Sequence, residues 1–156
     1  MIIKRYDDDY AAQVSEIVIR NLYEVNAADY GMDEMKAMAK RFRPEDIVEL
    51  NKTRVIFVAM NQGEVLGTGS ICNGFCEDKT EFWVLTVFVS PDHHRQAIGR
   101  QLMAVLEDEA NKLGCKHLIL PSSLTSHLFY KKLGYNYIGG EPVINDRQQY
   151  MMEKYL

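Results

Sequence analysis

The sequence runs Val87-Phe88-Val89-Ser90-Pro91-Asp92-His93-His94-Arg95-Gln96-Ala97-Ile98-Gly99-Arg100 at the point that decides its fold. This stretch predicts a buried strand, a tight turn and the start of an amphipathic helix, because proline ends a strand by lacking a donor. A helix start presents unpaired N–H groups and about half a positive charge, so it attracts phosphate. Small residues at Ala97 and Gly99 would let an anion approach the amides of 95–100, and Arg95 and Arg100 add charge. The alternative for this stretch alone is an ordinary strand-to-helix turn with a solvated basic edge.

Strand signals lie on the N-terminal side of this stretch. Residues 54–60 are β-branched and aromatic, and the turn Asn61-Gln62-Gly63 leads into a second strand over 64–72. These two strands are expected to form a hairpin. Residues 81–89 are apolar almost throughout, which predicts a third strand that is buried on both faces.

Amphipathic helices are expected on both sides of these strands. Asp8 or Asp9 can cap a first helix, and Asp33 can cap a second. The clearest helix runs from near Gly99 to Leu113, and Gly114 then provides a C-terminal stop. The residues expected to face the core are Ala11, Val14, Ile17, Val18 and Leu22 in the first helix, Met35, Met38 and Ala39 in the second, and Leu102, Met103, Leu106, Ala110 and Leu113 in the third.

The remaining elements complete a mixed α/β layout. Residues 115–120 predict a buried strand, 124–133 a short helix ended by Gly134, and the regions 135–138 and 148–154 two closing strands. The order is strand, two helices, three strands, helix, strand, helix and two strands. This order predicts antiparallel hairpins first and a βαβ crossover in the second half. A length of 156 residues suits one domain, residues 1–156, around one core.

Composition excludes several classes of protein. Hydrophobic residues make up 47% and charged residues 26%, which is an ordinary globular balance. A net charge of −4 gives no reason to expect nucleic acid as a partner. No apolar run approaches the ~20 residues that span a bilayer, so no membrane partner is expected. The charged start, residues 1–9, differs from a signal peptide, and we expect a cytoplasmic protein.

The cysteines give no reason to expect a disulfide framework or a metal site. Cys72, Cys76 and Cys115 are few and odd in number, which fits a reducing compartment. Cys72 and Cys76 could pair as metal ligands, but no second Cys/His pair has zinc spacing. We therefore expect buried thiols that behave as small hydrophobes and no bound metal.

A second segment, one helix downstream, adds specificity. It reads Leu118-Ile119-Leu120-Pro121-Ser122-Ser123-Leu124-Thr125-Ser126-His127-Leu128-Phe129-Tyr130-Lys131-Lys132-Leu133-Gly134-Tyr135. Here the chain resembles the GNAT superfamily of acyl-CoA N-acyltransferases. The second segment looks like that family's Phe-Tyr-x-Lys-Leu-Gly-aromatic signature, and Tyr150 to Lys154 look like its final strand. The resemblance extends over essentially the whole chain and implies a central mixed sheet of about six to seven strands with flanking helices.

The first segment looks like the pyrophosphate loop of the same family. That loop has a Gln or Arg, two free positions, a Gly, one free position, then Gly or Ala. Two positions depart from it, because His94 stands where Gln or Arg is usual and Ala97 where the first Gly is usual. Alanine still permits helical dihedrals, but its methyl group lies near the expected phosphates. The departures are therefore expected to affect the affinity for the cofactor without abolishing binding.

The resemblance implies acetyl-CoA as co-substrate and a set of residues that bind it. The amides of 95–100 would hold the pyrophosphate, and the strand at 87–89 would pair with the pantetheine arm as an added strand does. In this family the sheet opens at that point, often with a bulge. The implied cofactor-binding residues are Val87, Phe88, Val89, His94, Arg95, Gln96, Ala97, Ile98, Gly99, Arg100, Ser123, Phe129 and Tyr130.

Two catalytic roles follow from the resemblance and the chemistry. Tyr130 is expected to protonate the departing CoA thiolate; the alternative is that it packs the short helix on the sheet, as Phe129 is expected to do. A tyrosine with a pKa of ~10 is a weaker acid than a thiol at ~8.5, so full transfer is uphill by ~2 kcal/mol. Donation must then accompany bond breaking, or the site must lower the tyrosine pKa. Glu81 is the first candidate base, directly or through water; the alternative is a solvated carboxylate at the start of a strand.

The expected function is N-acetyl transfer from acetyl-CoA to a primary amine by direct attack. The acceptor would be an amine-bearing small molecule or a peptide or protein, bound where the N-terminal helices meet the sheet. The alternative is a non-catalytic CoA-binding regulatory module on the same fold. The loop 73–80 and the N-terminal helices, which would select the acceptor, carry no motif. The protein is expected to be a monomer or a homodimer.

Overall fold

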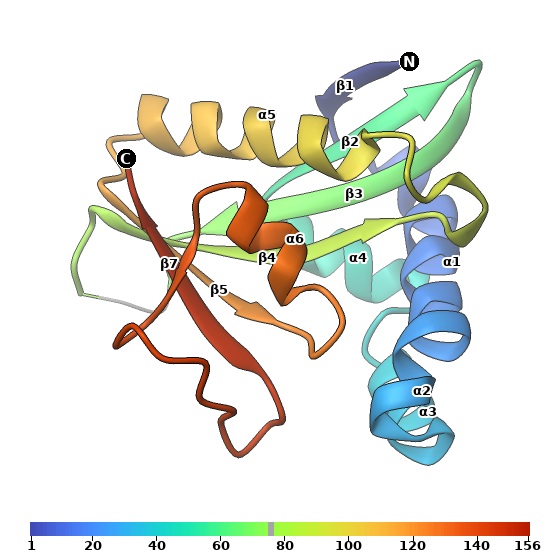
Figure 1. Ribbon diagram of the computed structural model, residues 1–156. Coiled ribbons are helices and arrows are strands. Elements are labelled where there is room, and N and C mark those ends of the chain that lie inside the picture. The colour runs from blue at the N-terminus through green and yellow to red at the C-terminus, as the bar shows by residue number, and fades with distance from the viewer. Residues whose placement is uncertain (75–76) are drawn as a thin grey trace.

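A computed structural model describes residues 1–74 and 77–156, and Cys76 lies outside the described residues. The fold is a seven-stranded mixed sheet in the order β1-β2-β3-β4-β5-β7-β6, with helices on both faces (Figure 1). The strands are β1 (Ile2–Arg5), β2 (Val55–Asn61), β3 (Glu64–Cys72), β4 (Glu81–Val89), β5 (His117–Ser122), β6 (Asn136–Tyr137) and β7 (Tyr150–Tyr155). The helices are α1 (Ala11–Asn21), α2 (Ala27–Tyr30), α3 (Met32–Ala39), α4 (Pro44–Asn51), α5 (Ile98–Lys112) and α6 (His127–Lys132). The mixed α/β architecture expected from the sequence is confirmed.

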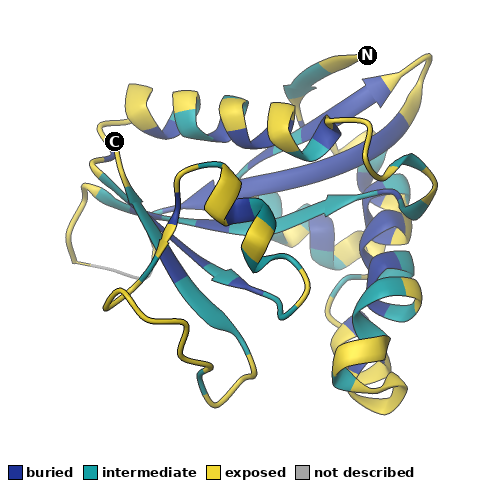
Figure 2. Cartoon of the chain, viewed as in Figure 1, coloured by how far each residue is buried: buried dark blue, intermediate teal, exposed yellow. Residues whose placement is uncertain are grey.

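Two groups of apolar side chains hold the helices on opposite faces of the sheet. On one face, α1, α3 and α4 bury side chains such as Val18, Met35 and Ile47 against β2 and β3. On the other face, Met103 and Leu106 of α5 pack with β3, β4 and β5. Figure 2 shows the outer side of α5 exposed and its sheet-facing side buried.

The helix ends differ from the sequence predictions in several details. Asp7, not Asp8 or Asp9, accepts from Asp9 N at a 3₁₀ turn over Asp8–Tyr10, and α1 follows that turn. Gly31, not Asp33, is the N-cap residue of α3. Met38 and Leu113, expected in the core, are exposed, whereas the other residues of the three predicted stripes are buried.

Helix α4 was not predicted, although the sequence carries its signals. Pro44 occupies the first turn, and the Asp46 carboxylate accepts a hydrogen bond from Arg43 N at 3.0 Å. Proline at a helix start and an acidic side chain three residues after the cap are a common combination. The Ile47 side chain alone in this helix is fully buried, so its hydrophobic periodicity is weak.

Strands β4 and β5 run parallel and separate after a short paired segment. Glu81–Trp83 pair with His117–Ile119, and the rest of the nine-residue β4 has no partner in β5 (Figure 1). The residues from Leu85 to Val89 are therefore half-buried. The prediction that β4 is buried on both faces is wrong: its paired half alternates half-buried and buried residues, and its other half has no neighbouring β5 strand beside it.

The connection from β4 through α5 to β5 is the predicted βαβ crossover, and Gly114 takes a φ of +87° where α5 ends. In the described part of the chain no helix has the length and apolar character that crossing a membrane requires.

Candidate functional site

The open half of β4 begins with a bulge. Thr68 of β3 pairs with Phe88, but Ser70 pairs with Leu85, so the register shifts by one residue. Gly69 therefore faces both Thr86 and Val87. Thr86 has a φ of +55°, a left-handed conformation that is rare for a β-branched residue. A bulge bends a strand and breaks its ladder, which explains why β4 leaves β5 at this point.

The bulge turns the peptide groups of Val87 and Val89 toward the side of β4 from which β5 has separated, which we call the opening. Ser90 N–H donates to Leu66 O of β3 at 2.8 Å. Because the peptide groups of an antiparallel strand alternate in direction, Phe88 also faces β3, and Val87 and Val89 face the side that β5 has left. The backbone geometry expected for an added strand is therefore present at Val87.

The carbonyl of Val89 already has two donors. Asn21 Nδ2 of α1 donates to Val89 O at 2.9 Å, and His94 Nε2 lies 3.0 Å from the same oxygen. Since a carbonyl only accepts, His94 Nε2 must carry a proton in this contact. His94 thus holds the turn to β4, a role that its place in the predicted phosphate loop did not reveal.

The turn after β4 takes an irregular path into α5. Arg95 and Ala97 have φ values of +65° and +61°, and Ala97 is the N-cap residue of the helix. Alanine permits right-handed helical dihedrals, but Ala97 takes the left-handed conformation instead. Gln101 N donates to Ala97 O at 3.1 Å, whereas the amides of 95–100 have no acceptor among the residues that the structure describes. Unbonded amides at a helix start can bind an anion, and that role of the loop stays a prediction.

Gly99 brings the two sequence motifs into contact. A Cβ atom at Gly99 would lie 3.2 Å from Cζ of Phe129 in α6 and 3.7 Å from Cγ2 of Val89. The glycine thus leaves room for an aromatic ring and a strand, in addition to any role toward a phosphate. Because both Val89 and Phe129 touch this point, the start of α5, the open half of β4 and α6 form one site.

Tyr130 is buried next to Phe129 in α6. Its ring lies 5.0 Å from the Phe129 ring and 5.9 Å from the Tyr135 ring, with both pairs edge to face. Burial raises the pKa of Tyr130 above its ordinary value. A raised pKa keeps the phenol protonated, as a proton donor requires, but it also makes the phenol a weaker acid. A lowered pKa of Tyr130 would make proton donation easier, but burial shifts this pKa in the opposite direction.

The loop between β5 and α6 is tied to α2. Tyr30 O–H donates to Gln148 O at 2.9 Å and accepts from Leu124 N at 3.1 Å. Asp29 Oδ2 accepts from Thr125 Oγ1 at 2.8 Å. In the same loop the hydroxyls of Ser123 and Ser126 contact each other. These contacts connect the N-terminal helices to the C-terminal half on one side of the opening.

Glu81 lies at the other end of β4. Its Oε2 is 3.0 Å from His117 Nδ1, and His117 Nε2 is 2.8 Å from Glu153 Oε2. The His117 ring also stacks on Tyr155 at a centroid distance of 4.4 Å. This network joins β4, β5 and β7 where they are paired. The role of Glu81 as a base stays a prediction.

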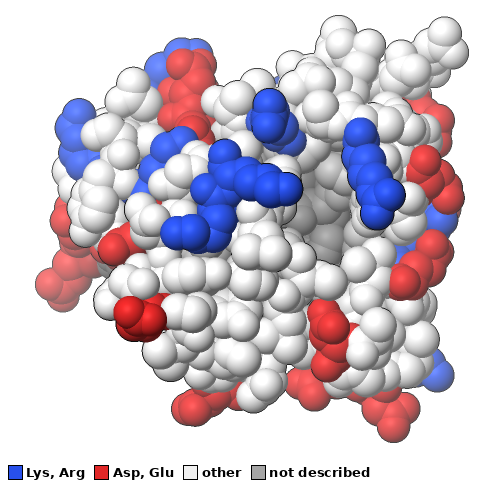
Figure 3. Space-filling view, in the orientation of Figure 1, with Lys and Arg blue, Asp and Glu red and all other residues white. Residues whose placement is uncertain are grey.

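The surface around the opening is positively charged. Figure 3 shows Lys and Arg side chains over α6 and the start of α5, and another on the α1 side, around a hollow between α6 and α1. Such a rim favours an anionic ligand.

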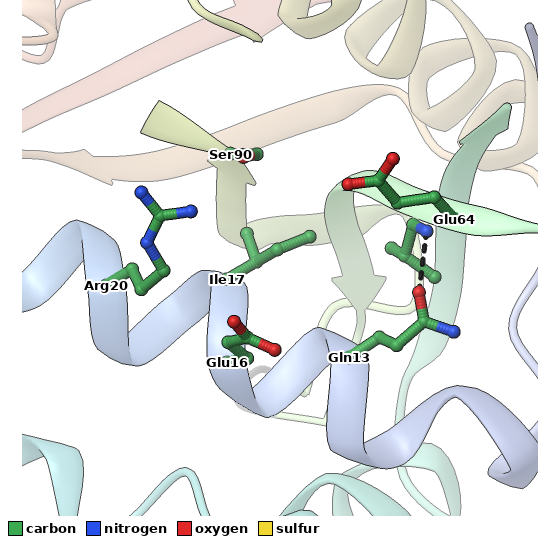
Figure 4. Close-up of a pocket in the computed structure, with 7 residues that line it drawn as sticks. Gln13, Glu16, Ile17, Arg20, Glu64 and Ser90 are labelled. Carbon is green, nitrogen blue, oxygen red and sulfur yellow. Dashed lines mark hydrogen bonds between the residues drawn. The ribbon is translucent and has the colours of Figure 1, made fainter. Parts of the chain in front are cut away.

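A separate cavity of about 120 Å³ lies between α1 and the ends of β3 and β4 (Figure 4). It contains none of the predicted site residues. Its lining consists of Gln13, Glu16, Ile17, Arg20, Glu64, Val65 and Ser90.

Sequence reasoning missed the residues that hold the site from the N-terminal side. Asn21 is a buried polar residue in the apolar stripe of α1, and this position was a usable signal. Asp29, Tyr30, Arg54 and Thr86 are brought to the site by tertiary contacts alone, and no spacing in the sequence indicates them.

Comparison with known proteins agrees with this geometry. The sequence model of the acetyltransferase (GNAT) family matches residues 19–135. PaiA N-acetyltransferase from Thermoplasma acidophilum, solved in complex with coenzyme A, has a TM-score of 0.82 at 15% identity, covering 100% of both chains. A GCN5-related N-acetyltransferase from Rhodopseudomonas palustris has a TM-score of 0.80 at 21% identity, covering 99% of this chain and 95% of that chain. An aminoglycoside 6'-N-acetyltransferase complexed with coenzyme A has a TM-score of 0.71 at 19% identity, covering 99% and 97%. Curated proteins give no match. At these identities the solved structures show a shared fold.

Proposed function

The chain belongs to the acetyltransferase (GNAT) family, and on that premise we propose that it transfers an acetyl group from acetyl-CoA to a primary amine by direct attack. One observation carries the proposal. The open, bulged half of β4 lies next to the unbonded amides of 95–100, with Tyr130 on the adjoining helix α6. An extended, amide-rich arm with a phosphate at one end and a thioester at the other fits this arrangement.

The proposed cofactor position follows the exposed backbone groups. The pantetheine arm would pair with Val87, whose peptide groups face the opening. The pyrophosphate would lie at the start of α5, where amides and the helix dipole favour negative charge. Phe129 and Ser123 would border the arm from α6 and the loop before it. The positive rim seen in Figure 3 supports this placement.

Tyr130 is proposed as the donor to the leaving thiolate. Attack by the amine gives a tetrahedral intermediate, and its collapse expels the thiolate of CoA. Because burial raises the pKa of Tyr130, complete transfer of its proton before C–S cleavage would be more uphill than for an ordinary tyrosine. Donation is therefore proposed to accompany C–S bond breaking, when the sulfur gains negative charge.

Direct attack is favoured over an acyl-enzyme route by the state of the described thiols. Cys115 is fully buried, and burial raises the pKa of its thiol. Cys72 is buried as well. A nucleophilic cysteine needs exposure and a lowered pKa, so neither described thiol is suited to carry the acetyl group. Initial-rate patterns for two substrates should then intersect rather than run parallel.

The acceptor is proposed to be an amine-bearing small molecule or a peptide or protein. Its ammonium, with a pKa of ~10.4 for a lysine-like amine, must lose a proton before attack. Glu81 remains the proposed base and would have to act through water, because six residues of strand to Val87 span ~20 Å.

The direct test of this function is turnover. The protein is incubated with acetyl-CoA and a panel of small amines and lysine-containing peptides, and release of the CoA thiol is followed. Thiol release that depends on the amine supports the proposal. CoA binding without release for any amine would instead identify a non-catalytic CoA-binding module.

A further inference from the structure

Thr86 adopts a conformation that must be held by its surroundings. Its φ of +55° lies in the left-handed region, and a β-branched side chain makes this region especially unfavourable. Such outliers persist only where neighbouring contacts enforce them, and they gather at functional sites. Thr86 is the bulge residue directly before Val87, so its conformation determines where the Val87 peptide groups point.

A chain of hydrogen bonds runs from Arg54 to the bulge. Arg54 Nη1 donates to Thr86 Oγ1 at 3.0 Å. Ser70 Oγ donates to Leu85 O at 2.9 Å and lies 3.3 Å from Thr86 Oγ1. Since a hydroxyl has one proton to give, Thr86 O–H donates to Ser70 while its oxygen accepts from Arg54. The side chain of Thr86 is thus held from both sides.

Arg54 is placed for this contact by the end of α4. Its backbone N–H donates to Leu50 O at 3.0 Å, which closes the helix one residue before β2 begins. Arg54 is half-buried, and no carboxylate of the described chain forms an ion pair with it. Burial lowers the pKa of this guanidinium. A partly desolvated arginine that lacks a carboxylate partner is costly, so another benefit must retain it.

The space beside Arg54 is small. Arg54, Ser70 and Thr86 line a cavity of about 10 Å³ together with apolar residues of α1, α4 and β2. This volume is at the lower limit of what a single water molecule needs. The contact that the structure gives the guanidinium is its hydrogen bond to Thr86 Oγ1, within the protein itself.

We propose that Arg54 is a positioning residue that locks Thr86 in its left-handed conformation and thereby presents the Val87 peptide groups to acetyl-CoA. The proposal rests on the function proposed above. It differs from a general packing role, because it makes the effect of Arg54 depend on the strain at position 86. Glycine adopts positive φ without a steric penalty, so Thr86→Gly should remove the need for Arg54.

The test is a double-mutant cycle read out as CoA affinity. Calorimetry gives the Kd of CoA for the wild type, Arg54→Met, Thr86→Gly and the double variant, and thermal unfolding without ligand reports the fold. We expect Arg54→Met to weaken CoA binding about tenfold, which corresponds to about 1.4 kcal/mol. In the chain that carries Thr86→Gly, Arg54→Met should cause little further loss.

Further variants separate the role from folding. Arg54→Lys keeps a donor on a long stem and should retain most of the affinity. Thr86→Val keeps the β-branched shape but lacks the hydroxyl that Arg54 binds, so it should also weaken CoA binding about tenfold. It provides the same test of the contact if Arg54→Met does not fold. Arg5→Met is the matched control. Arg5 lies in the edge strand β1, with its guanidinium over the ring of Phe57, and its replacement should leave the Kd of CoA unchanged.

The outcomes distinguish the two proposals. A wild type that does not bind CoA contradicts the proposed function. A wild type that binds CoA, together with unchanged affinity in Arg54→Met or Thr86→Val, overturns the positioning role. Equal losses from Arg54→Met with and without Thr86→Gly overturn it as well, because the effect would then be independent of the strain.

Discussion

Gly99 and Phe129 are in contact across the site: a Cβ atom on Gly99 would lie 3.2 Å from Phe129 Cζ. The predicted pyrophosphate loop and the α6 motif, separated by an α-helix and a strand in the sequence, are therefore packed as one unit. A movement of α6 would carry Tyr130 with it and would displace the first turn of α5.

This contact predicts the effect of a side chain at position 99. Gly99→Val should lower the free energy of unfolding by about 1–3 kcal/mol, the usual cost of overpacking, and should also weaken CoA binding. Phe129→Leu in the same chain removes the ring edge and should recover part of both losses. Denaturant unfolding and calorimetry check this result; strictly additive losses would show that the two residues act separately.

The left-handed conformation of Ala97 predicts that an alanine-to-glycine substitution affects stability differently at position 97 and at position 104. Its φ of +61° costs about 1–2 kcal/mol for a residue with a Cβ atom, so Ala97→Gly should leave stability unchanged or raise it by up to about 1 kcal/mol. Ala104, exposed within α5, is the matched control. Ala104→Gly should lower stability by about 1 kcal/mol. A comparable loss in both variants would mean that Ala97 is unstrained.

Tyr130→Phe should separate chemistry from packing. The ring contacts with Phe129 and Tyr135 remain, so the midpoint of unfolding should change little. We expect kcat to fall about 10²-fold, the lower part of the range for general acid catalysis, because a thiolate leaves readily. Single-turnover rates measure the chemical step. Tyr10→Phe, which removes a hydroxyl bound to Lys4, is the control, and wild-type rates in Tyr130→Phe would refute the assignment.

The raised pKa of Tyr130 also predicts a pH effect on stability. The unfolded tyrosine ionises near pH 10, whereas the buried one keeps its proton to a higher pH. Its contribution is therefore complete below pH ~10 and is lost as the pH rises above that value. Unfolding midpoints measured from pH 8 to 11 should fall less steeply for Tyr130→Phe; identical slopes would argue against the raised pKa.

Glu81→Gln tests the proposed base. If Glu81 removes the amine proton, kcat/KM should fall mainly at neutral pH and approach wild type at high pH, where free amine is abundant. A pH–rate profile that overlays wild type would remove Glu81 from the chemistry. The role of Glu81 would then be its contact with His117. In that case Glu81→Gln and His117→Gln should lower the free energy of unfolding by similar amounts.

The sequence predicted most of the fold because its strongest elements are locally determined. The β4 strand at 81–89 has the predicted bounds, since it is apolar almost throughout and Pro91 follows it closely. Helix α5 starts one residue before its predicted position. Helix α4 was not predicted because its hydrophobic periodicity is weak: Ile47 is its only fully buried residue.

The details that shape the site depend on tertiary contacts. The left-handed conformations of Thr86 and Ala97 run against the local preference of both residues, so no sequence pattern indicates them. The contact between Arg54 and Thr86 joins positions 32 residues apart. The backbone of the predicted cofactor loop follows an irregular path that the sequence did not indicate, because the turn is determined partly by His94 and Asn21 binding Val89 O.

The central claim is that CoA binds along the open half of β4 with its phosphates at the start of α5. Calorimetric titration of CoA into the wild-type protein at two salt concentrations tests it most directly. We expect one site per chain, with an affinity that falls as salt screens the phosphates from Arg95 and Arg100. Absence of binding, or an affinity that does not change with salt, would contradict it.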